Sequence, residues 1–158
     1  MTEYLLTLKL IHILGGTVLF GTGLGIAFFM FMAHRTRDAA IIAHTARIVV
    51  LADVTFTANA VIVQPVSGTY LVLAIGYSFW EPWIVTSLAL YVVVGLCWLP
   101  VLWIQARIRD LARQAVQDGA DLPERYERLF RIWFVLGWPA FIGVIAIFVL
   151  MIFKPALW

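Results

Sequence analysis

The chain has 158 residues, of which 63% are hydrophobic and 13% are charged, and its formal net charge is +2. Its mean hydropathy is +0.97. A soluble domain of this length keeps about a quarter of its residues charged, so the composition excludes an ordinary soluble domain and indicates an integral membrane protein.

Four apolar segments reach the length of roughly 20 residues that a membrane-spanning helix needs. They cover about residues 4–32, 48–75, 83–104 and 132–153, and the polar residues collect mainly in loops 34–47 and 105–131. The first segment lacks the basic start and the cleavage site of a signal peptide, so we expect it in the mature protein. Because the connections are short, consecutive helices should pack together. The sequence thus predicts one all-α integral membrane domain over residues 1–158, an antiparallel bundle of four transmembrane helices.

The arginines predict the orientation of this bundle. Three lie in loop 34–47 and six in loop 105–131, whereas the connection 76–82 has no lysine or arginine. The positive-inside rule places both arginine-rich loops in the cytoplasm, and hence both termini on the periplasmic side of a bacterial inner membrane. Aromatic residues suited to an outer interfacial belt agree with this: Tyr77, Phe79, Trp80, Trp83 and Trp158.

The third loop is expected to form a short helical hairpin. The third segment continues past Arg107 without a breaker until Gly119 and Pro123, and the next segment begins near Glu124. Basic and acidic side chains alternate at helical spacing there. This pattern is typical of a surface that faces water and lipid headgroups, and we expect no nucleic-acid partner.

His12 lies within the first apolar segment, where an ionisable residue is costly and indicates a function by default. On the same helical face follow Gly15, Gly16 and Gly23, which would form a shallow groove beneath the imidazole. Such glycines usually admit a neighbouring helix. They would also leave space for a flat macrocycle whose iron is bound by His12, the only candidate metal ligand that we assign. The alternative is a hydrogen-bonded structural histidine.

Lys9 precedes His12 by one helical turn on the same side. Its ammonium group can reach the outer interface. It can instead pair with an acidic ligand group such as a haem propionate, or alter the charge state of His12.

The second segment carries several polar residues, of which Asp53 is the only acid. It should lie about one turn into the membrane from the cytoplasmic side, close in sequence to His44 and Arg47. A buried ion pair or a helix-end anchor is the simpler interpretation, and a proton relay is the alternative. Further along, Gln64, Pro65 and Gly68 are expected to distort the helix and to form one wall of a ligand cavity.

No second histidine lies at the depth of His12, since His34 and His44 are both on the cytoplasmic side. The chain therefore cannot build a pair of bis-histidine haems from its own residues. Other residues at a suitable depth to approach a ligand held by His12 are Tyr70, Thr86, Ser87, Tyr91 and Met151. Of these, Met151 or Tyr91 could supply a second axial ligand, unless the site is shared across a homodimer.

Two sets of residues resemble known families of small four-helix membrane proteins. The first and last helices are similar to those of the bacterial membrane protoporphyrinogen oxidase (HemJ-type) family, in Lys9, His12, Gly16, Gly23, His34, Arg35, Phe130, Arg131, Pro139, Lys154 and Pro155. A broader set resembles an uncharacterised family of predicted four-helix bacterial integral membrane proteins, in Gly15, Gly21, Gly25, Asp53, Gln64, Pro65, Gly68, Gln105 and Arg107. The first resemblance implies a haem b or porphyrin site with His12 as axial ligand. That family has a lysine in the third helix where this chain has Thr86 or Ser87, so oxidase activity does not carry over directly.

The sequence-based hypothesis is therefore a haem b-binding inner-membrane protein with a redox or haem-handling role. Its expected partners are the lipid bilayer, an electron-transfer or quinone partner, and a second copy of the chain. A cofactor-free structural subunit is the competing hypothesis. A small proton-coupled transporter that uses His12, Lys9 and Asp53 ranks third.

Overall fold

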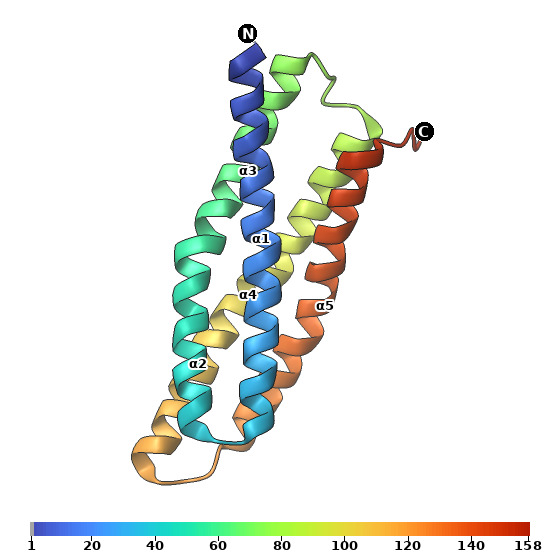
Figure 1. Ribbon diagram of the computed structural model, residues 1–158. Coiled ribbons are helices and arrows are strands. Elements are labelled where there is room, and N and C mark those ends of the chain that lie inside the picture. The colour runs from blue at the N-terminus through green and yellow to red at the C-terminus, as the bar shows by residue number, and fades with distance from the viewer. Residues whose placement is uncertain (1) are drawn as a thin grey trace.

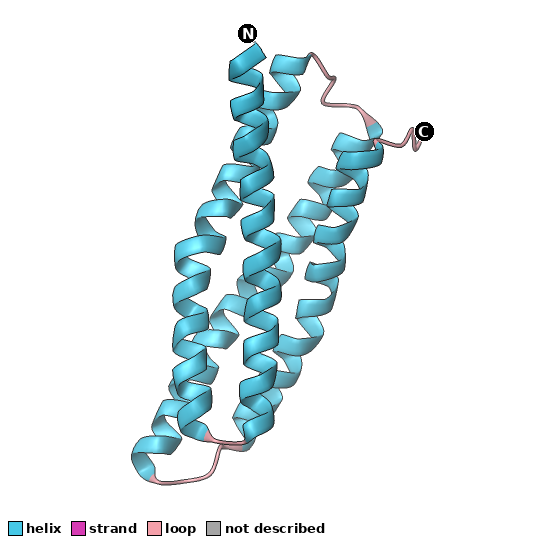
Figure 2. Cartoon of the chain, in the orientation of Figure 1, coloured by secondary structure: helices cyan, strands magenta, loops and turns pink. Residues whose placement is uncertain are grey.

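The computed structural model describes residues 2–158, and all of its regular structure is helical. The elements are α1 (Thr2–Thr36), α2 (Ala39–Ala52), the π-helical turn η1 (Asp53–Thr57), α3 (Ala58–Ile75), α4 (Pro82–Asp118) and α5 (Glu124–Phe153). Helices α2, η1 and α3 continue into one another without a loop, so the described chain forms four long rods (Figures 1 and 2). Each rod is long and apolar enough to cross a membrane.

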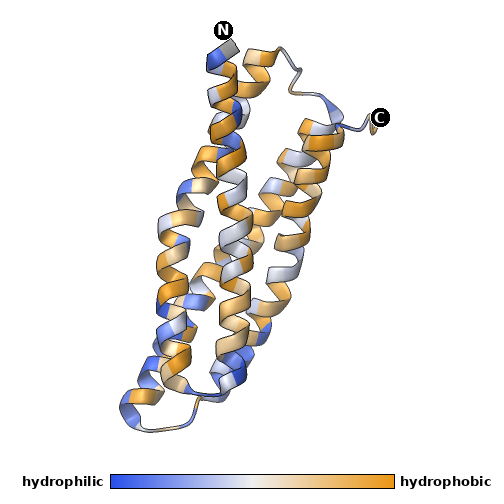
Figure 3. Cartoon of the chain, viewed as in Figure 1, coloured by the Kyte–Doolittle hydropathy of each residue, from blue (hydrophilic) through white to orange (hydrophobic). Residues whose placement is uncertain are grey.

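The two chain ends and the α3–α4 connection lie at one end of the molecule, and the α1–α2 and α4–α5 connections lie at the other (Figure 1). Hydrophilic residues gather at the end that carries the α1–α2 and α4–α5 connections, while the lengths of the rods are mostly hydrophobic (Figure 3). Large apolar side chains such as Leu96 and Ile152 are exposed along the rods, at 65% and 72% of their surface. Lipid tails can cover such side chains, whereas a soluble protein rarely exposes so many of them to water.

The helices extend further than the expected spans. Residues 39–47 form the first part of α2 and do not form a loop, so the first connection is reduced to Arg37 and Asp38. Asp38 caps α2, because its carboxylate accepts hydrogen bonds from the backbone N–H groups of Ala40 and Ile41 at 2.7 and 3.1 Å. At the next arginine-rich connection, α4 ends before Gly119, which adopts a left-handed conformation (φ +59°) that glycine tolerates.

The best-packed part of the protein lies toward the arginine-rich end. There α1, α2, α4 and α5 bury one apolar cluster that includes Met30, Ile42, Ile108 and Tyr126. Further from that end, α3 replaces α2 as the neighbour of α1, and α4 packs mainly against α5. Fewer large side chains are buried in this half, and a cavity remains between the helices.

The second rod is irregular at a different place from the one expected. The helix runs unbroken from Ala58 to Ile75 through Gln64, Pro65 and Gly68. The irregular turn is η1, where the backbone N–H of Ala58 bonds to the carbonyl of Asp53, five residues earlier. Such π-turns insert one extra residue into a helix and occur often at functional sites.

Candidate functional site

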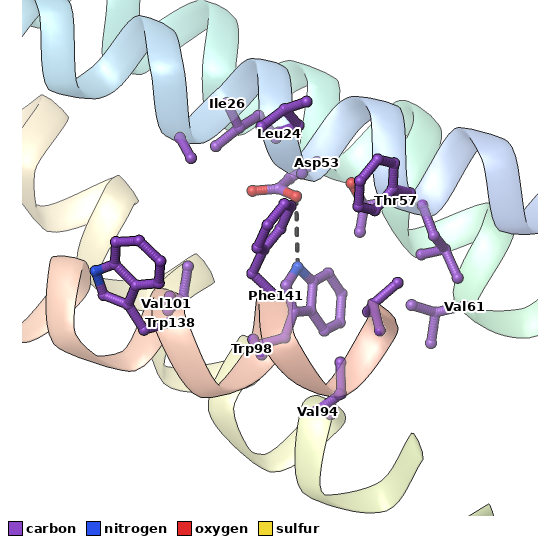
Figure 4. Close-up of a pocket in the computed structure, with 18 of the residues that line it drawn as sticks. Leu24, Ile26, Asp53, Thr57, Val61, Val94, Trp98, Val101, Trp138 and Phe141 are labelled. Carbon is purple, nitrogen blue, oxygen red and sulfur yellow. Dashed lines mark hydrogen bonds between the residues drawn. The ribbon is translucent and has the colours of Figure 1, made fainter. Parts of the chain in front are cut away.

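A cavity of about 360 Å³ lies in the middle of the bundle, bounded by α1, η1, α3, α4 and α5 (Figure 4). This volume falls in the range of roughly 300–1,000 Å³ that small-molecule sites occupy. The walls are mostly apolar and rich in aromatic rings. The aromatic residues of the lining are Phe20, Tyr91, Trp98, Trp133, Phe134, Trp138, Phe141 and Phe148.

The cavity opens between α1 and α5. All of the lining residues classed as exposed belong to these two helices: Gly23, Leu24, Ala27, Phe134 and Trp138. The lining residues of η1, α3 and α4 are buried or half-buried. Since the outer surfaces of α1 and α5 are apolar, this opening faces the part of the molecule that lipid would cover.

Asp53 contributes the only acidic group to the cavity wall and is only 3% exposed. The indole Nε1 of Trp98 donates to its Oδ1 at 3.4 Å, as the dashed line in Figure 4 shows. With the amide nitrogen of Gln105 turned toward Asp53, it donates to Oδ2 at 2.6 Å, and the Gln105 oxygen accepts from the Nε1 of Trp133 at 3.1 Å. A chain of hydrogen bonds therefore joins η1, α4 and α5 at the edge of the cavity.

The ion pair considered for Asp53 does not form. His44 and Arg47 are exposed on α2, and the salt bridges among residues 2–158 join Arg37 to Glu127 and Arg109 to Asp110. The donors that meet the carboxyl of Asp53 are thus both neutral.

Thr57 lies at the far end of η1 and also lines the cavity (Figure 4). Its side chain is 6% exposed, and its Oγ1 has no hydrogen-bond partner among the described residues. Buried hydroxyl groups without a partner are uncommon, because leaving water without a new hydrogen bond costs free energy. The cavity therefore presents one unsatisfied polar atom beside an acid.

Tyr91 reaches across from α4 to α3. Proline has no N–H, so Pro65 cannot bond to the carbonyl of Val61 four residues earlier. The hydroxyl of Tyr91 donates to that carbonyl at 2.5 Å. Tyr91 therefore supplies the bond that Pro65 omits, and its oxygen is already engaged, although the sequence suggested it as a second haem ligand.

His12 packs against α3 and is not part of the cavity lining. Its Nδ1 lies 2.9 Å from the hydroxyl of Ser67, and its ring is next to Gly68, where an added Cβ would lie 3.2 Å from Cε1. The amide of Gln64 donates to the backbone carbonyl of His12 at 2.7 Å. The histidine is therefore held by hydrogen bonds between α1 and α3.

The expected glycine groove is divided between two uses. Gly15 is in contact with the amide of Gln64, and a Cβ on Gly16 would lie 3.3 Å from the ring of Phe148. Gly16 and Gly23 line the cavity, whereas His12 does not and bonds to Ser67 of α3. The structure does not gather the predicted residues around one point.

The other residues predicted to form the ligand site make contacts different from those of His12. Lys9 is exposed. The hydroxyls of Thr86 and Ser87 donate to backbone carbonyls of their own helix, at 2.7 and 2.6 Å, and Met151 is half-buried. Among residues 2–158, no three histidine, cysteine, aspartate or glutamate side chains cluster in a way that could hold a metal ion.

Sequence reasoning did not single out Trp98, Trp133 and Thr57, and it named Gln105 only through a family resemblance. One signal was present. Asp53 and Gln105 are both polar residues near the arginine-rich ends of apolar segments, so they should lie at similar depths. The tryptophans gave no such signal, because seven of them are spread along the chain.

The fold and the apolar surface define a multi-pass integral membrane protein built from four long helices. The profile of one family, described as "Predicted integral membrane protein (DUF2269)", matches residues 6–155. The chain belongs to this family. No curated protein and no solved structure is significantly similar to it. The uncharacterised membrane family expected from the sequence is therefore confirmed, and the resemblance to the protoporphyrinogen oxidases stays a prediction.

Proposed function

We propose that this protein binds a lipophilic, ring-bearing molecule from the bilayer in the cavity between its four helices. The observation that carries the proposal is an aromatic cavity of about 360 Å³ that opens between the lipid-facing helices α1 and α5. Sites of this kind use apolar walls for affinity and a few polar groups for orientation. Asp53 and Thr57 are the polar groups placed to orient a ligand. Quinones and tetrapyrroles are flat redox-active molecules of this class.

The proposal is tested by filling the cavity. Gly95 lines it from α4, and a Cβ there would meet no atom within 4 Å, so the backbone at this position accepts a side chain and Gly95→Phe is designed to fill the cavity with a ring. The adjacent Leu96 is 65% exposed, and Leu96→Phe adds a similar ring on the lipid side as the control. We expect Gly95→Phe to weaken binding of a neutral bicyclic fluorophore, N-phenyl-1-naphthylamine, by about tenfold or more, a change of roughly 1.4 kcal/mol. Equal binding by wild type and Gly95→Phe would contradict the proposal.

The same proposal includes an orientation for the bundle. We infer that both termini and the α3–α4 connection face the periplasm of a bacterial inner membrane, because the arginine-rich connections should face the cytoplasm. In a Cys97→Ser background, a membrane-impermeant maleimide added to intact cells should label Ser78→Cys and not Asp118→Cys. Labelling of Asp118→Cys alone would reverse the orientation.

A second candidate function is haem b binding with His12 as axial ligand. The hydrogen bond between Nδ1 and Ser67 favours it, because metal-ligating histidines usually hold one ring nitrogen in this way and keep the other for the metal. The space beside Gly15 is taken by Gln64, so a macrocycle there requires Gln64 to move. When bound, haem would supply electron transfer or oxidation chemistry, and this chain would supply the ligand and the apolar surroundings.

The visible spectrum of the purified protein tests this second candidate. The candidate predicts a Soret band in wild type that is lost in His12→Ala and altered in Ser67→Ala. A band that His12→Ala leaves unchanged, or wild type that shows none after incubation with haem, would exclude His12 ligation. Weaker fluorophore binding by Gly95→Phe tests the cavity and does not test haem ligation, because His12 does not line the cavity.

A further inference from the structure

The cavity combines a buried acid with several aromatic rings, and among the described residues no lysine, arginine or histidine forms an ion pair with that acid. Asp53 is almost fully buried, and its donors Trp98 and Gln105 carry no charge. A carboxylate has about four acceptor positions, of which these donors occupy two. An ionised carboxylate is costly to bury unless a positive charge accompanies it, and without one the carboxyl takes up a proton.

The rings near Asp53 are suited to hold that positive charge. Trp98 donates a hydrogen bond to the carboxyl, and Phe141 and Trp138 line the same cavity as Asp53 (Figure 4). Phe20 of α1 stacks on Phe141 with ring centroids 5.3 Å apart, which holds both rings in place and leaves the outer face of each uncovered by the other. Cations are attracted to the faces of tryptophan and phenylalanine rings, most strongly where water is excluded.

The unsatisfied oxygen of Thr57 points to a ligand in the same place. It lies on the same π-turn as Asp53, is buried, and lines the cavity; its hydroxyl makes no hydrogen bond of full geometry among the described residues, although it lies close enough to the Asp53 carboxyl to interact with it, and its oxygen keeps its acceptor positions free. A hydroxyl oxygen accepts hydrogen bonds from ammonium N–H groups and turns its negative end toward a cation. The acid, the hydroxyl oxygen and the aromatic rings therefore all interact favourably with a cation.

We propose that the cavity binds a lipophilic organic cation, a ring-bearing molecule with a protonated or quaternary nitrogen that pairs with Asp53. This inference rests on the proposed function and adds the charge of the ligand to it. The apolar opening between α1 and α5 suits a molecule that concentrates in the bilayer and brings its charge with it.

Two probes of nearly identical shape test the charge. N-methyl-4-phenylpyridinium is a permanent cation, and 4-methylbiphenyl is the corresponding neutral hydrocarbon. Their binding to purified full-length protein in detergent is measured by equilibrium dialysis, with Gly95→Phe defining the part that does not depend on the cavity. We expect wild type to prefer the cation by about tenfold or more, since an opposite charge at a few ångströms is worth several kcal/mol even at an effective dielectric constant of about 20.

Asp53→Asn removes the charge and keeps the side-chain shape. It should lower the affinity for the cation by about tenfold or more and leave the neutral probe unchanged. Asp110→Asn removes a carboxylate from the exposed part of α4 and serves as the control. Far-UV circular dichroism confirms that each variant is folded. If Asp53→Asn fails to fold, the preference of wild type for one probe over the other still decides the question.

The outcomes separate the two proposals. Suppose that Gly95→Phe abolishes binding of the neutral probe. If the cation then binds wild type no better than the neutral probe does, or binds wild type and Asp53→Asn equally, the cavity is a binding site and the preference for a cationic ligand is refuted. If neither probe depends on Gly95, the proposed function fails with it. Cation binding that requires both Gly95 and Asp53 supports both.

Discussion

The hydrogen bond between Tyr91 and Val61 offers a sharp test of how the helices around the cavity are held. Pro65 leaves the Val61 carbonyl without its helical donor, and the Tyr91 hydroxyl takes that place at 2.5 Å. Tyr91→Phe removes this hydroxyl and keeps the ring that lines the cavity. The carbonyl of Val61 then has neither its helical donor nor the hydroxyl.

The expected cost follows from two magnitudes. Hydrogen bonds between membrane helices contribute about 0.6 kcal/mol on average and up to about 1.7. A buried carbonyl that loses its partner costs about 1–3 kcal/mol. Because the carbonyl of Val61 has lost its backbone donor to Pro65, we expect Tyr91→Phe to lower the free energy of unfolding by about 1–2 kcal/mol.

Restoring the missing backbone donor should remove most of this cost. Pro65→Ala supplies an N–H that can reach the Val61 carbonyl, so the double variant should show a coupling of about 1 kcal/mol between the two positions. Unfolding in SDS mixed micelles, followed by circular dichroism, measures each free energy. Tyr70→Phe is the control, because Tyr70 is 53% exposed on the same helix as Pro65. A coupling near zero, or a Tyr91→Phe protein as stable as wild type, would refute the reasoning.

Three further predictions concern packing, the buried polar chain and the exposed ion pair. Gly143→Ala places a methyl group 2.6 Å from Val94 of α4 and should lower the free energy of unfolding by about 1–3 kcal/mol in the same assay. Gly137→Ala is the control, because its methyl group would enter open space. Equal effects of the two variants would argue against close α4–α5 packing. Gln105→Leu removes the hydrogen-bond partner of the Asp53 carboxyl and of the Trp133 indole, and it should lower the free energy of unfolding by about 2–3 kcal/mol. An unchanged unfolding midpoint would show that this chain of hydrogen bonds is not formed. Arg37→Ala breaks the exposed pair with Glu127 and should cost under about 1 kcal/mol, an effect that should vanish in 1 M salt; a larger, salt-independent loss would contradict it.

The expectations for individual residues succeeded where the reason was local. The stop at Gly119 and the start near Glu124 could be predicted, because glycine readily adopts the left-handed conformation that ends a helix and proline restricts φ, whatever surrounds them. The π-turn at Asp53–Thr57 could not, since a helix accommodates one extra residue only when the side chains around it favour the shift. Pro65 misled for the related reason that Tyr91, distant in sequence, compensates for the missing bond.

His12 illustrates the limit of reasoning from one helix. Its cost in a membrane segment predicted a functional role for it, and the structure shows that the face of α1 that carries it packs on Ser67 and Gly68 of α3. Helical spacing relates residues on one helix, and it contains no information about which neighbour covers that face. The cavity was therefore found near glycines of the same helix and away from the imidazole.

By itself, the sequence determined that the protein is a membrane protein with four long helices, because hydropathy and segment length depend only on the order of residues along the chain. Only the tertiary structure decided that Asp53, Trp98, Gln105 and Trp133, drawn from three different elements, meet at one cavity. Their meeting depends on helix rotation and on the extra residue in η1. Both follow from the packing of side chains between helices, and no single segment specifies that packing.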